Sequence, residues 1–275
     1  MNILVSGSSS GIGRYLAGRL LASGHSIWGF SRSGGGDVPH ARFHARSCDV
    51  ADWDEVSRLA SSIAAEPGFV GFDALVHCAA VQGPAGPAMT VAPLAWSNTV
   101  RANLDGTYFV IRAFFPLLRR DDETRRKILC FSGGGASAAR VNFSAYGSSK
   151  SGVVRLVETL AEEFGDAAVD INAIAPGALP TQMTEDVIRA GGEAAGAEEV
   201  AAARRTLAEG QERFARLGAL IDFLLGPDSD GITGRLLSAP WDPWERLPQY
   251  KEQLRSSDIY KLRRVTPADR GEKWD

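Results

Sequence analysis

The chain opens on a glycine-rich segment, VSGSSSGIG at residues 5–13, that follows a short apolar run. Residues this small let another molecule approach the backbone closely, and glycine permits a tight turn between a strand and a helix. A helix over residues 11–23 would present free N–H groups and the positive end of its dipole to an anion. The segment therefore predicts a loop that holds the pyrophosphate of a dinucleotide, formed by Gly7, Ser9, Ser10, Gly11, Ile12 and Gly13. The alternative is a flexible turn without a ligand.

Apolar runs and helical patterns alternate along the rest of the chain. We expect strands at 2–6, 26–31, within 41–50, at 72–80, 127–132, 169–175 and around 234–239. The expected later helices are 53–65, 93–120, 144–164 and 213–225. Strands apolar on both faces that alternate with helices are typical of a covered parallel sheet. Right-handed crossovers then predict a doubly wound, Rossmann-like α/β fold, with one domain over 1–240 and a C-terminal tail over 241–275.

Composition limits the partners and the compartment. The 275 residues carry a net charge of −3, which provides no basic face for nucleic acid. The three cysteines form no CxxC motif, which favours a reducing compartment over a disulfide framework. There is no leader pattern and no apolar run of the ~18 residues that span a bilayer. We expect a cytoplasmic protein with no nucleic-acid or membrane partner.

The end of the second expected strand reads Ser31, Arg32, Ser33. In this fold that position meets the adenosine ribose of a dinucleotide. An acidic residue there would bind two ribose hydroxyls and repel a 2′-phosphate, whereas a guanidinium binds phosphate in bidentate fashion. The sequence therefore favours NADP(H) over NAD(H), with Arg32 as the discriminating residue. The alternative is an arginine that faces solvent.

Tyr146 and Lys150 are four residues apart on an expected helix and so share one face. Most such pairs are surface residues. A phenol with a pKa near ~10 exchanges its proton poorly at neutral pH. An adjacent ammonium, together with the positive charge of oxidised nicotinamide, would stabilise the phenolate and lower that pKa. The pair therefore suits proton transfer to a carbonyl that receives hydride.

With these motifs placed, residues 2–240 resemble the short-chain dehydrogenase/reductase family, especially its classical members with a YxxxK motif. The resemblance is carried by the G-x3-G-I-G loop, CDV (48–50), ALVHCAA (74–80), RANLDGTYF (101–109), YGSSK (146–150) and IAPGALPT (174–181). It implies an oxidoreductase that transfers hydride between NADP(H) and a small-molecule carbonyl or secondary alcohol, with Tyr146 as acid/base. It also implies a homodimer or homotetramer.

The resemblance assigns roles to further residues. Lys150 would bind the nicotinamide ribose, and Asn103 would lie in a distorted helix and hold a water that passes protons to Lys150. Asp49 would contact the adenine amino group through its side chain, and Val50 through its backbone. The adenosine would also meet the backbone of Cys78, Ala79 and Ala80, and the nicotinamide carboxamide would meet Pro176, Gly177 and Thr181. The alternatives are a helix-interior asparagine bonded to nearby backbone and a simple strand-terminating turn.

The sequence departs from the family at the catalytic serine, which usually lies thirteen residues before the tyrosine. That position is Gly133. Our candidate substitute is Ser132, because the glycine run would let the backbone shift. Ser137 is also close, backbone N–H groups could polarise the oxygen instead, and a catalytically degraded site is a further reading. Cys78 and Ala80 also replace the family's asparagine and glycine, so stabilisation by that asparagine should be lost.

Two other functions stay open. One is a non-enzymatic dinucleotide-binding regulator, which Gly133 favours. The other is an epimerase or dehydratase that retains its nucleotide. We expect no metal site, because the four-residue spacing of His40, His44 and Cys48 falls on a loop that enters a strand.

Two later segments bear on the substrate. Residues 178–212 follow the sixth expected strand, are rich in small and polar residues, and suit a mobile substrate lid. The tail carries Trp241 and Trp244 between prolines. It could cap the substrate pocket, pack on a neighbouring subunit, or pack on its own domain. The sequence leaves the substrate open among sugars, polyketides, steroids and simple ketones.

Overall fold

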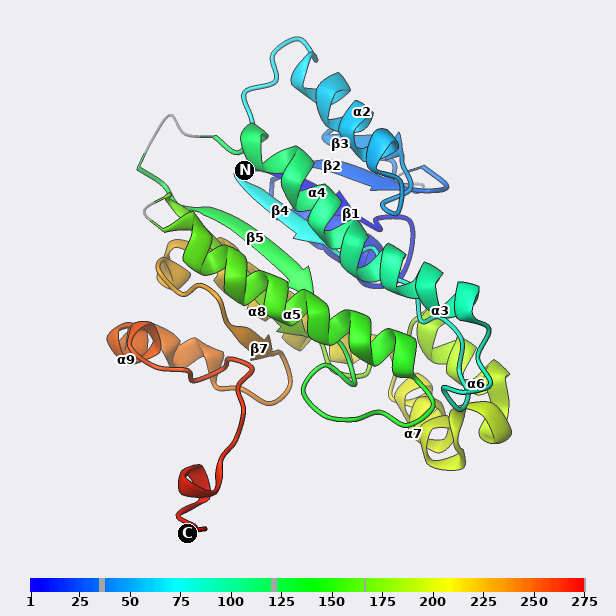
Figure 1. Ribbon diagram of the computed structural model, residues 1–275. Helices are drawn as coiled ribbons and strands as arrows, with labels where there is room; N and C mark the ends of the chain where they lie inside the picture. Colours follow the sequence, from blue (N-terminus) through cyan, green and yellow to red (C-terminus); the bar gives the residue numbers. More distant parts are fainter. Residues whose placement is uncertain (35–37, 120–122, 166, 275) are drawn as a thin grey trace.

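The computed structural model describes residues 1–34, 38–119, 123–165 and 167–274. Seven parallel strands form one sheet in the order β3-β2-β1-β4-β5-β6-β7 (Figure 1). The strands are β1 (Asn2–Ser6), β2 (Ser26–Ser31), β3 (Phe43–Ser47), β4 (Ala74–His77), β5 (Arg126–Phe131), β6 (Val169–Ala175) and β7 (Leu236–Ser238). The strand order reverses between β1 and β4, and in such sheets ligands bind at the carboxyl ends beside this point. The predicted doubly wound α/β fold is confirmed.

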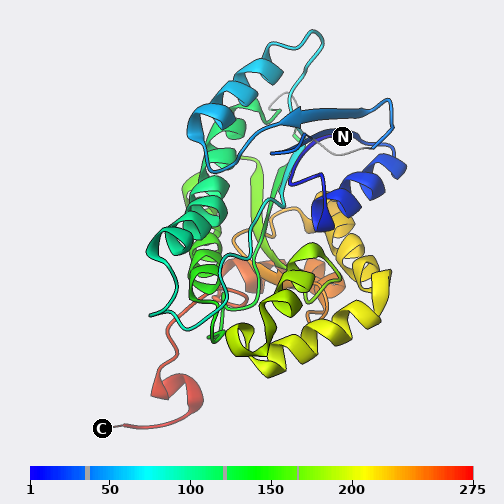
Figure 2. The ribbon, with the colours of Figure 1, turned by 90° about the vertical axis from the view of Figure 1, so that its right-hand side faces the viewer.

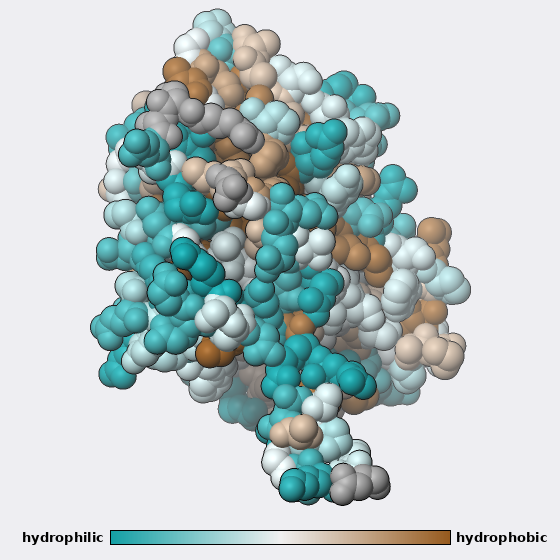
Figure 3. Space-filling model, turned by 60° about the vertical axis from the view of Figure 1, so that its left-hand side comes forward, coloured by the Kyte–Doolittle hydropathy of each residue, from teal (hydrophilic) through white to brown (hydrophobic). Residues whose placement is uncertain are grey.

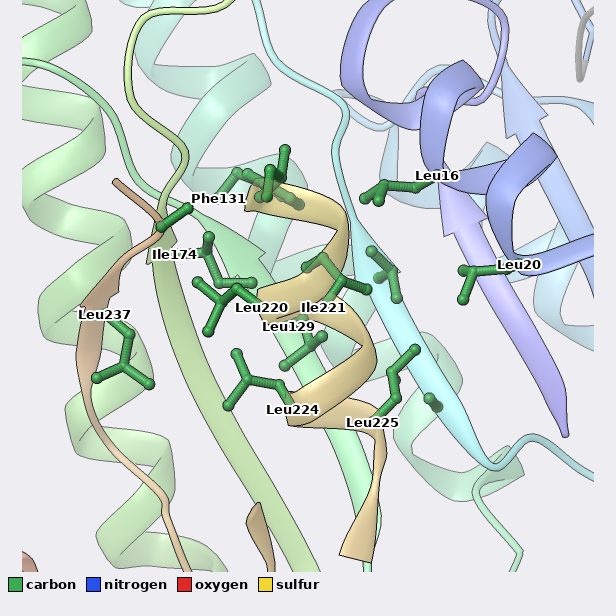
Figure 4. Packing of buried hydrophobic residues seen from close by; sticks show 14 of the residues in the cluster. Leu16, Leu20, Leu129, Phe131, Ile174, Leu220, Ile221, Leu224, Leu225 and Leu237 are labelled. Atoms are coloured by element: carbon green, nitrogen blue, oxygen red, sulfur yellow. The ribbon is translucent and has the colours of Figure 1, made fainter. Parts of the chain in front are cut away.

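Helices cover both faces of the sheet (Figure 2). On one face lie α2 (Trp53–Ala64), α4 (Gly106–Phe114) and α5 (Ser144–Phe164), which share a buried apolar cluster with the strands. On the other lie α1 (Gly11–Ala22) and α8 (Arg213–Leu225), with a second cluster. Figure 4 shows Leu220, Ile221 and Leu224 of α8 packed toward Leu129 and Ile174 of the sheet. Because helices bury the sheet on both faces, its strands are apolar on both sides.

The expected helix over 93–120 forms in separate parts. It runs as α3 (Pro93–Val100), a π-helical turn (Arg101–Asp105), α4, and a 3-10 turn (Phe115–Leu117). The widened π turn interrupts the regular hydrogen-bond ladder, a feature often found at functional sites. Further 3-10 turns lie at Gly210–Glu212 and Pro227–Ser229.

The segment expected as a mobile lid is folded into two helices. These are α6 (Gln182–Ala195) and α7 (Ala197–Ala208), and we call residues 182–208 the lid hairpin. Gly196 joins the helices with a φ of 97°, a left-handed conformation that favours glycine. Alanine, glutamate and arginine are strong helix formers, which explains why so polar a segment is helical.

The C-terminal segment first packs on the sheet domain and then leaves it. Trp244 and Leu247, in a 3-10 helix (Trp244–Tyr250), and Leu254 of α9 (Lys251–Arg255) are buried in the cluster around α8. A last 3-10 turn (Pro267–Arg270) lies in the end of the chain that protrudes in Figure 3, where most surrounding side chains are hydrophilic. Across the described residues, no helix is both long and apolar enough to cross a membrane.

Candidate active site

One large cleft of about 1390 Å³ opens at the carboxyl ends of the strands. It brings together every predicted site residue except Asn103, although those residues come from seven separate segments. They are Gly7, Ser9, Ser10, Gly11, Ile12, Gly13, Ser31, Arg32, Ser33, Asp49, Val50, Cys78, Ala79, Ala80, Ser132, Tyr146, Lys150, Pro176, Gly177 and Thr181. Asn103 is fully buried directly behind the cleft residue Ala102.

The glycine loop is built from backbone packed against backbone. Gly7 has a φ of 68°, and a Cβ at this position would lie 2.9 Å from the nitrogen of Ala79. A Cβ on Gly13 would lie 2.2 Å from the carbonyl oxygen of Gly7. Ser10 precedes α1, and its side chain makes no capping hydrogen bond to that helix. The first N–H groups of α1 therefore face the cleft without a side-chain cap, as an anion-binding helix start requires.

At each end of the cleft, short contacts hold residues in place. Gly11 lies beside Thr181, because a Cβ on Gly11 would be 3.5 Å from the Thr181 methyl carbon. At the other end Arg32 is exposed, and its carbonyl accepts a 3.0 Å hydrogen bond from the Ser47 hydroxyl. The carboxylate of Asp49 accepts a hydrogen bond from the nitrogen of Ala51 at 3.0 Å. The loop that follows β2 thus leaves the Arg32 guanidinium at the rim.

A buried histidine that the sequence analysis did not single out ties β1 to β4. Nδ1 of His77 lies 2.9 Å from the hydroxyl oxygen of Ser6, and that oxygen accepts a hydrogen bond from the nitrogen of Ala79 at 3.0 Å. Burial lowers the pKa of His77 to about 3, so the ring is neutral. Ser6 and His77 thus supply a tie between the strands although Cys78 replaces the family's asparagine.

Asn103 lies in the π turn, and the expected helix distortion at this position is confirmed. Its amide oxygen accepts from the nitrogen of Val81 at 2.8 Å. Its amide nitrogen donates to the carbonyl of Val81 and to the hydroxyl of Ser149, both at 3.0 Å. The side chain therefore bonds to nearby backbone, as the alternative reading expected, and it connects the loop after β4 to α5.

Tyr146 and Lys150 lie on the buried side of α5, with 7% and 3% of their surfaces exposed. The ammonium of Lys150 donates to the carbonyl of Phe131, the last residue of β5, at 2.8 Å. Its nitrogen lies 5.8 Å from the centre of the Tyr146 ring. Burial lowers the pKa of Lys150 to about 8. The helix spacing thus places both groups in the cleft, with the amine fixed by the sheet.

The expected direction of the Tyr146 pKa is wrong for the protein by itself. Burial raises the pKa of the phenol because the phenolate loses its hydration, and the charge that opposes this effect is Arg140. The amine of Lys150 donates to the Phe131 carbonyl and lies 5.8 Å from the ring centre. The phenol therefore keeps its proton at neutral pH.

The glycine run after β5 explains the missing serine. A Cβ on Gly133 would lie 2.3 Å from the hydroxyl oxygen of Tyr146, so no side chain fits there. The neighbouring Ser132 is buried, and its hydroxyl has no hydrogen-bond partner within the part of the chain that the structure describes. Ser137 also lines the cleft, but its side chain is exposed. Ser132 is therefore the hydroxyl with a free donor.

The lid hairpin lies on the loop that precedes α5. Val187, Ala195 and Ala203 of the hairpin pack on Phe143 and Tyr146 in a small apolar cluster.

The C-terminal tail meets the cleft as well, because Trp241 lines it while 83% of its surface is exposed. Trp244 is buried against α8, which matches packing on its own domain.

His44 and Cys48, which we did not expect to bind a metal, have surroundings that differ from those of metal ligands. His44 lies in β3 and stacks on Trp28, with ring centres 4.3 Å apart. Cys48 is buried, which raises its pKa to about 12. Among the described residues, no three His, Cys, Asp or Glu side chains are grouped to hold a metal ion.

Comparison with known proteins identifies the family. The family model described as "Enoyl-(Acyl carrier protein) reductase" matches residues 7–239. The chain belongs to the short-chain dehydrogenase/reductase family. This short-chain dehydrogenase/reductase is 30% identical to the 3-oxoacyl-[acyl-carrier-protein] reductase MabA of Mycobacterium tuberculosis, over 66% of the chain and 71% of the relative. It is 31% identical to the D-threitol dehydrogenase of Mycolicibacterium smegmatis, over 66% and 70%. It is thus an oxidoreductase that uses a nicotinamide dinucleotide.

Solved structures share the fold of this short-chain dehydrogenase/reductase. The aldohexose dehydrogenase of Thermoplasma acidophilum superposes with a TM-score of 0.72 at 23% identity, over 86% of this chain and 91% of that one. A short-chain dehydrogenase of Escherichia coli CFT073 in complex with NADPH superposes with a TM-score of 0.69 at 22% identity, over 87% and 96%. At these identities the likeness establishes the fold.

Proposed function

We propose that this protein is an NADP(H)-dependent oxidoreductase that transfers hydride between the nicotinamide and a carbonyl or secondary alcohol. The observation that carries the proposal is the meeting of Tyr146, Lys150 and Ser132 in the cleft that also holds the glycine loop. A proton donor, a cation and a free hydroxyl donor are the groups that carbonyl reduction needs. The proposal places all three at one end of a groove long enough for a dinucleotide.

The described residues fit the cofactor. A Cβ on Gly7 or Gly13 would collide with backbone, so the loop is a bare peptide surface that N–H groups can present to a pyrophosphate. Arg32 would bind the 2′-phosphate of NADP(H), with Ser31 and Ser33 beside it. Asp49, Val50 and residues 78–80 would line the adenosine, and Pro176, Gly177 and Thr181 the carboxamide. The related fold solved with NADPH agrees with this preference.

The bound nucleotide supplies or accepts the hydride, and the protein handles the proton. In reduction, Tyr146 donates its phenolic proton to the substrate oxygen, and in oxidation the phenolate removes the proton from the alcohol. Burial raises the pKa of Tyr146, so the acid form is ready at neutral pH. This protonation state favours the reductase direction.

Ser132 and Lys150 act beside the phenol. The Ser132 hydroxyl is buried without a partner among the described residues, and a shift of the glycine run would bring it to a substrate oxygen that satisfies its donor. Lys150 is held by the Phe131 carbonyl and would hydrogen-bond the nicotinamide ribose. Asn103 supports both by joining the loop after β4 to α5, and we assign it a water on the path of protons to Lys150.

We extend the proposal to the domains, the oligomeric state and the compartment of the enzyme. We assign residues 1–240 to one catalytic domain that contains the lid, and 241–275 to a C-terminal tail. We also propose a cytoplasmic homodimer or homotetramer with a small-molecule substrate and no nucleic-acid or membrane partner.

A panel of ketones with purified protein tests the proposal. We expect NADPH oxidation with at least one ketone, and slower oxidation of NADH. Binding of NADPH without oxidation across sugars, polyketide-like ketones, steroids and simple ketones would favour the non-enzymatic regulator, which the glycine at position 133 supports. Nucleotide that stays bound through purification would instead point to an epimerase or dehydratase.

A further inference from the structure

An ion pair crosses from the loop before α5 to the lid hairpin at the substrate end of the cleft. Arg140 donates through Nε to one carboxylate oxygen of Glu199 at 3.2 Å, and through Nη2 to the other at 2.7 Å. The Arg140 side chain is 18% exposed and that of Glu199 is 37% exposed. Both residues line the cleft. A partly shielded bidentate pair of this kind has a defined geometry.

The same guanidinium lies against the proton donor. Its central carbon is 3.9 Å from the centre of the Phe143 ring and 5.9 Å from the centre of the Tyr146 ring. The glycine run lies beside this guanidinium, and a Cβ on Gly134 would be in ordinary contact with the Arg140 side chain at 3.5 Å.

We propose that Arg140 is a positioning residue for the proton step: its charge favours the phenolate of Tyr146, and Glu199 weakens that effect while it is bonded to Arg140. The inference rests on the proposed role of Tyr146. A cation near the ring stabilises the phenolate, and a carboxylate bonded to that cation cancels part of its field. The ion pair thus adds to the effect of burial, which already favours the protonated phenol.

Other ionisable groups also lie around Tyr146. Lys150 lies on the same helix but bonds to Phe131. On α6, Asp186 and Arg189 line the cleft and form an ion pair with each other at 2.5 Å. Burial raises the pKa values of the Cys78 and Cys130 thiols and lowers that of His77, so all three are uncharged. Lys150 lies equally close to the ring, but Arg140 is the cation that is paired with the lid hairpin, through Glu199.

Titration of the phenol in the protein without cofactor tests the inference. The near-ultraviolet signal of tyrosine ionisation is recorded seconds after a pH jump. Subtracting the signal of the same variant carrying Tyr146→Phe isolates this residue among the five tyrosines. Arg140→Gln should raise the midpoint by about one pH unit, and Glu199→Gln should lower it by a similar amount. Arg140→Lys, which restores the charge, should return the midpoint toward that of the unmodified protein.

Arg204→Gln is the matched control, because it removes an exposed cation from α7 outside the cleft and should leave the midpoint unchanged. A purely structural role predicts that both Arg140→Gln and Glu199→Gln loosen the lid and move the midpoint in one direction. That result, or no shift, would overturn the inference. The proposed function has a separate test, because turnover by Tyr146→Phe, or no oxidation of NADPH with any ketone, would overturn it whatever the titration midpoints are.

Discussion

The hydroxyl oxygen of Tyr146 occupies the space that a side chain on Gly133 would need, 2.3 Å from the position of its Cβ. Carbon Cε1 and carbon Cζ of the ring are each 2.9 Å from the same position. The family's usual serine is therefore incompatible with this orientation of the tyrosine. The glycine at 133 thus leaves room for the hydroxyl group of Tyr146.

Gly133→Ser should reduce activity, although it restores the family's usual residue. The new Cβ would displace the Tyr146 ring, and a misplacement of about 1 Å costs roughly 100-fold in rate. We expect kcat to fall by about that factor and the melting temperature to drop. The double variant Gly133→Ser/Tyr146→Phe should recover part of the lost stability, because it removes the colliding oxygen. A single variant more active than the parent would show that the site uses the family's serine geometry.

Ser132→Ala should separate activity from stability. If the Ser132 hydroxyl polarises the substrate oxygen, its removal should lower kcat by roughly 100-fold. Because the hydroxyl is buried without a partner among the described residues, the free energy of unfolding should stay equal or rise. Steady-state kinetics and thermal unfolding of one preparation measure both. Unchanged kcat would transfer this role to Ser137 or to backbone N–H groups, which Ser137→Ala would distinguish.

Arg32→Asp should reverse the choice of cofactor. Loss of the guanidinium removes charge-assisted hydrogen bonds to the 2′-phosphate, which contribute about 1.5–3 kcal/mol, and NADPH affinity should fall roughly 10- to 100-fold. NADH affinity should rise, because the carboxylate can accept from ribose hydroxyls. Fluorescence titration with both nucleotides measures this. Arg58→Asp makes the same charge change at an exposed site on α2 and should leave the preference unchanged. A parent protein that binds both nucleotides equally would contradict the assignment of Arg32.

His77→Asn should make the protein more resistant to acid. The folded-state pKa of His77 is about 3, against an ordinary value of 6.5. The unfolded chain therefore binds an extra proton below pH 6.5, and stability is lost as pH falls from 6.5 toward 3. At pH 5 the loss amounts to about 2 kcal/mol. Denaturant unfolding at pH 7 and pH 5 should show a smaller difference for His77→Asn than for His40→Asn, which changes an exposed histidine. Equal differences would mean that His77 is not the buried titrating group.

Much of the fold and cofactor groove could be predicted from sequence, because local patterns encode them. The glycine loop, the strand ends and the spacing of Tyr146 and Lys150 each depend on neighbours in sequence. Arg140 was missed because its partner Glu199 lies 59 residues away on the lid hairpin. The effect of burial on the Tyr146 pKa was missed because burial depends on packing, in this case by the lid hairpin.

The lid hairpin shows a second limit. Its composition of small and polar residues indicated a lid but not its helices, in which Val187, Ala195 and Ala203 pack on Phe143 and Tyr146. Sequence patterns indicate helix formation weakly when the apolar face is narrow. His77 was missed for a related reason, since its hydrogen bond to Ser6 joins residues 71 positions apart.

The kinetics of Tyr146→Phe test the central claim most directly. The variant removes the phenolic proton and keeps the ring that packs under the lid hairpin. With NADPH and a ketone that the parent protein reduces, we predict that kcat falls by at least 100-fold while the dissociation constant for NADPH stays within about twofold. Turnover close to that of the parent protein would contradict the account, because the proton would then come from another group.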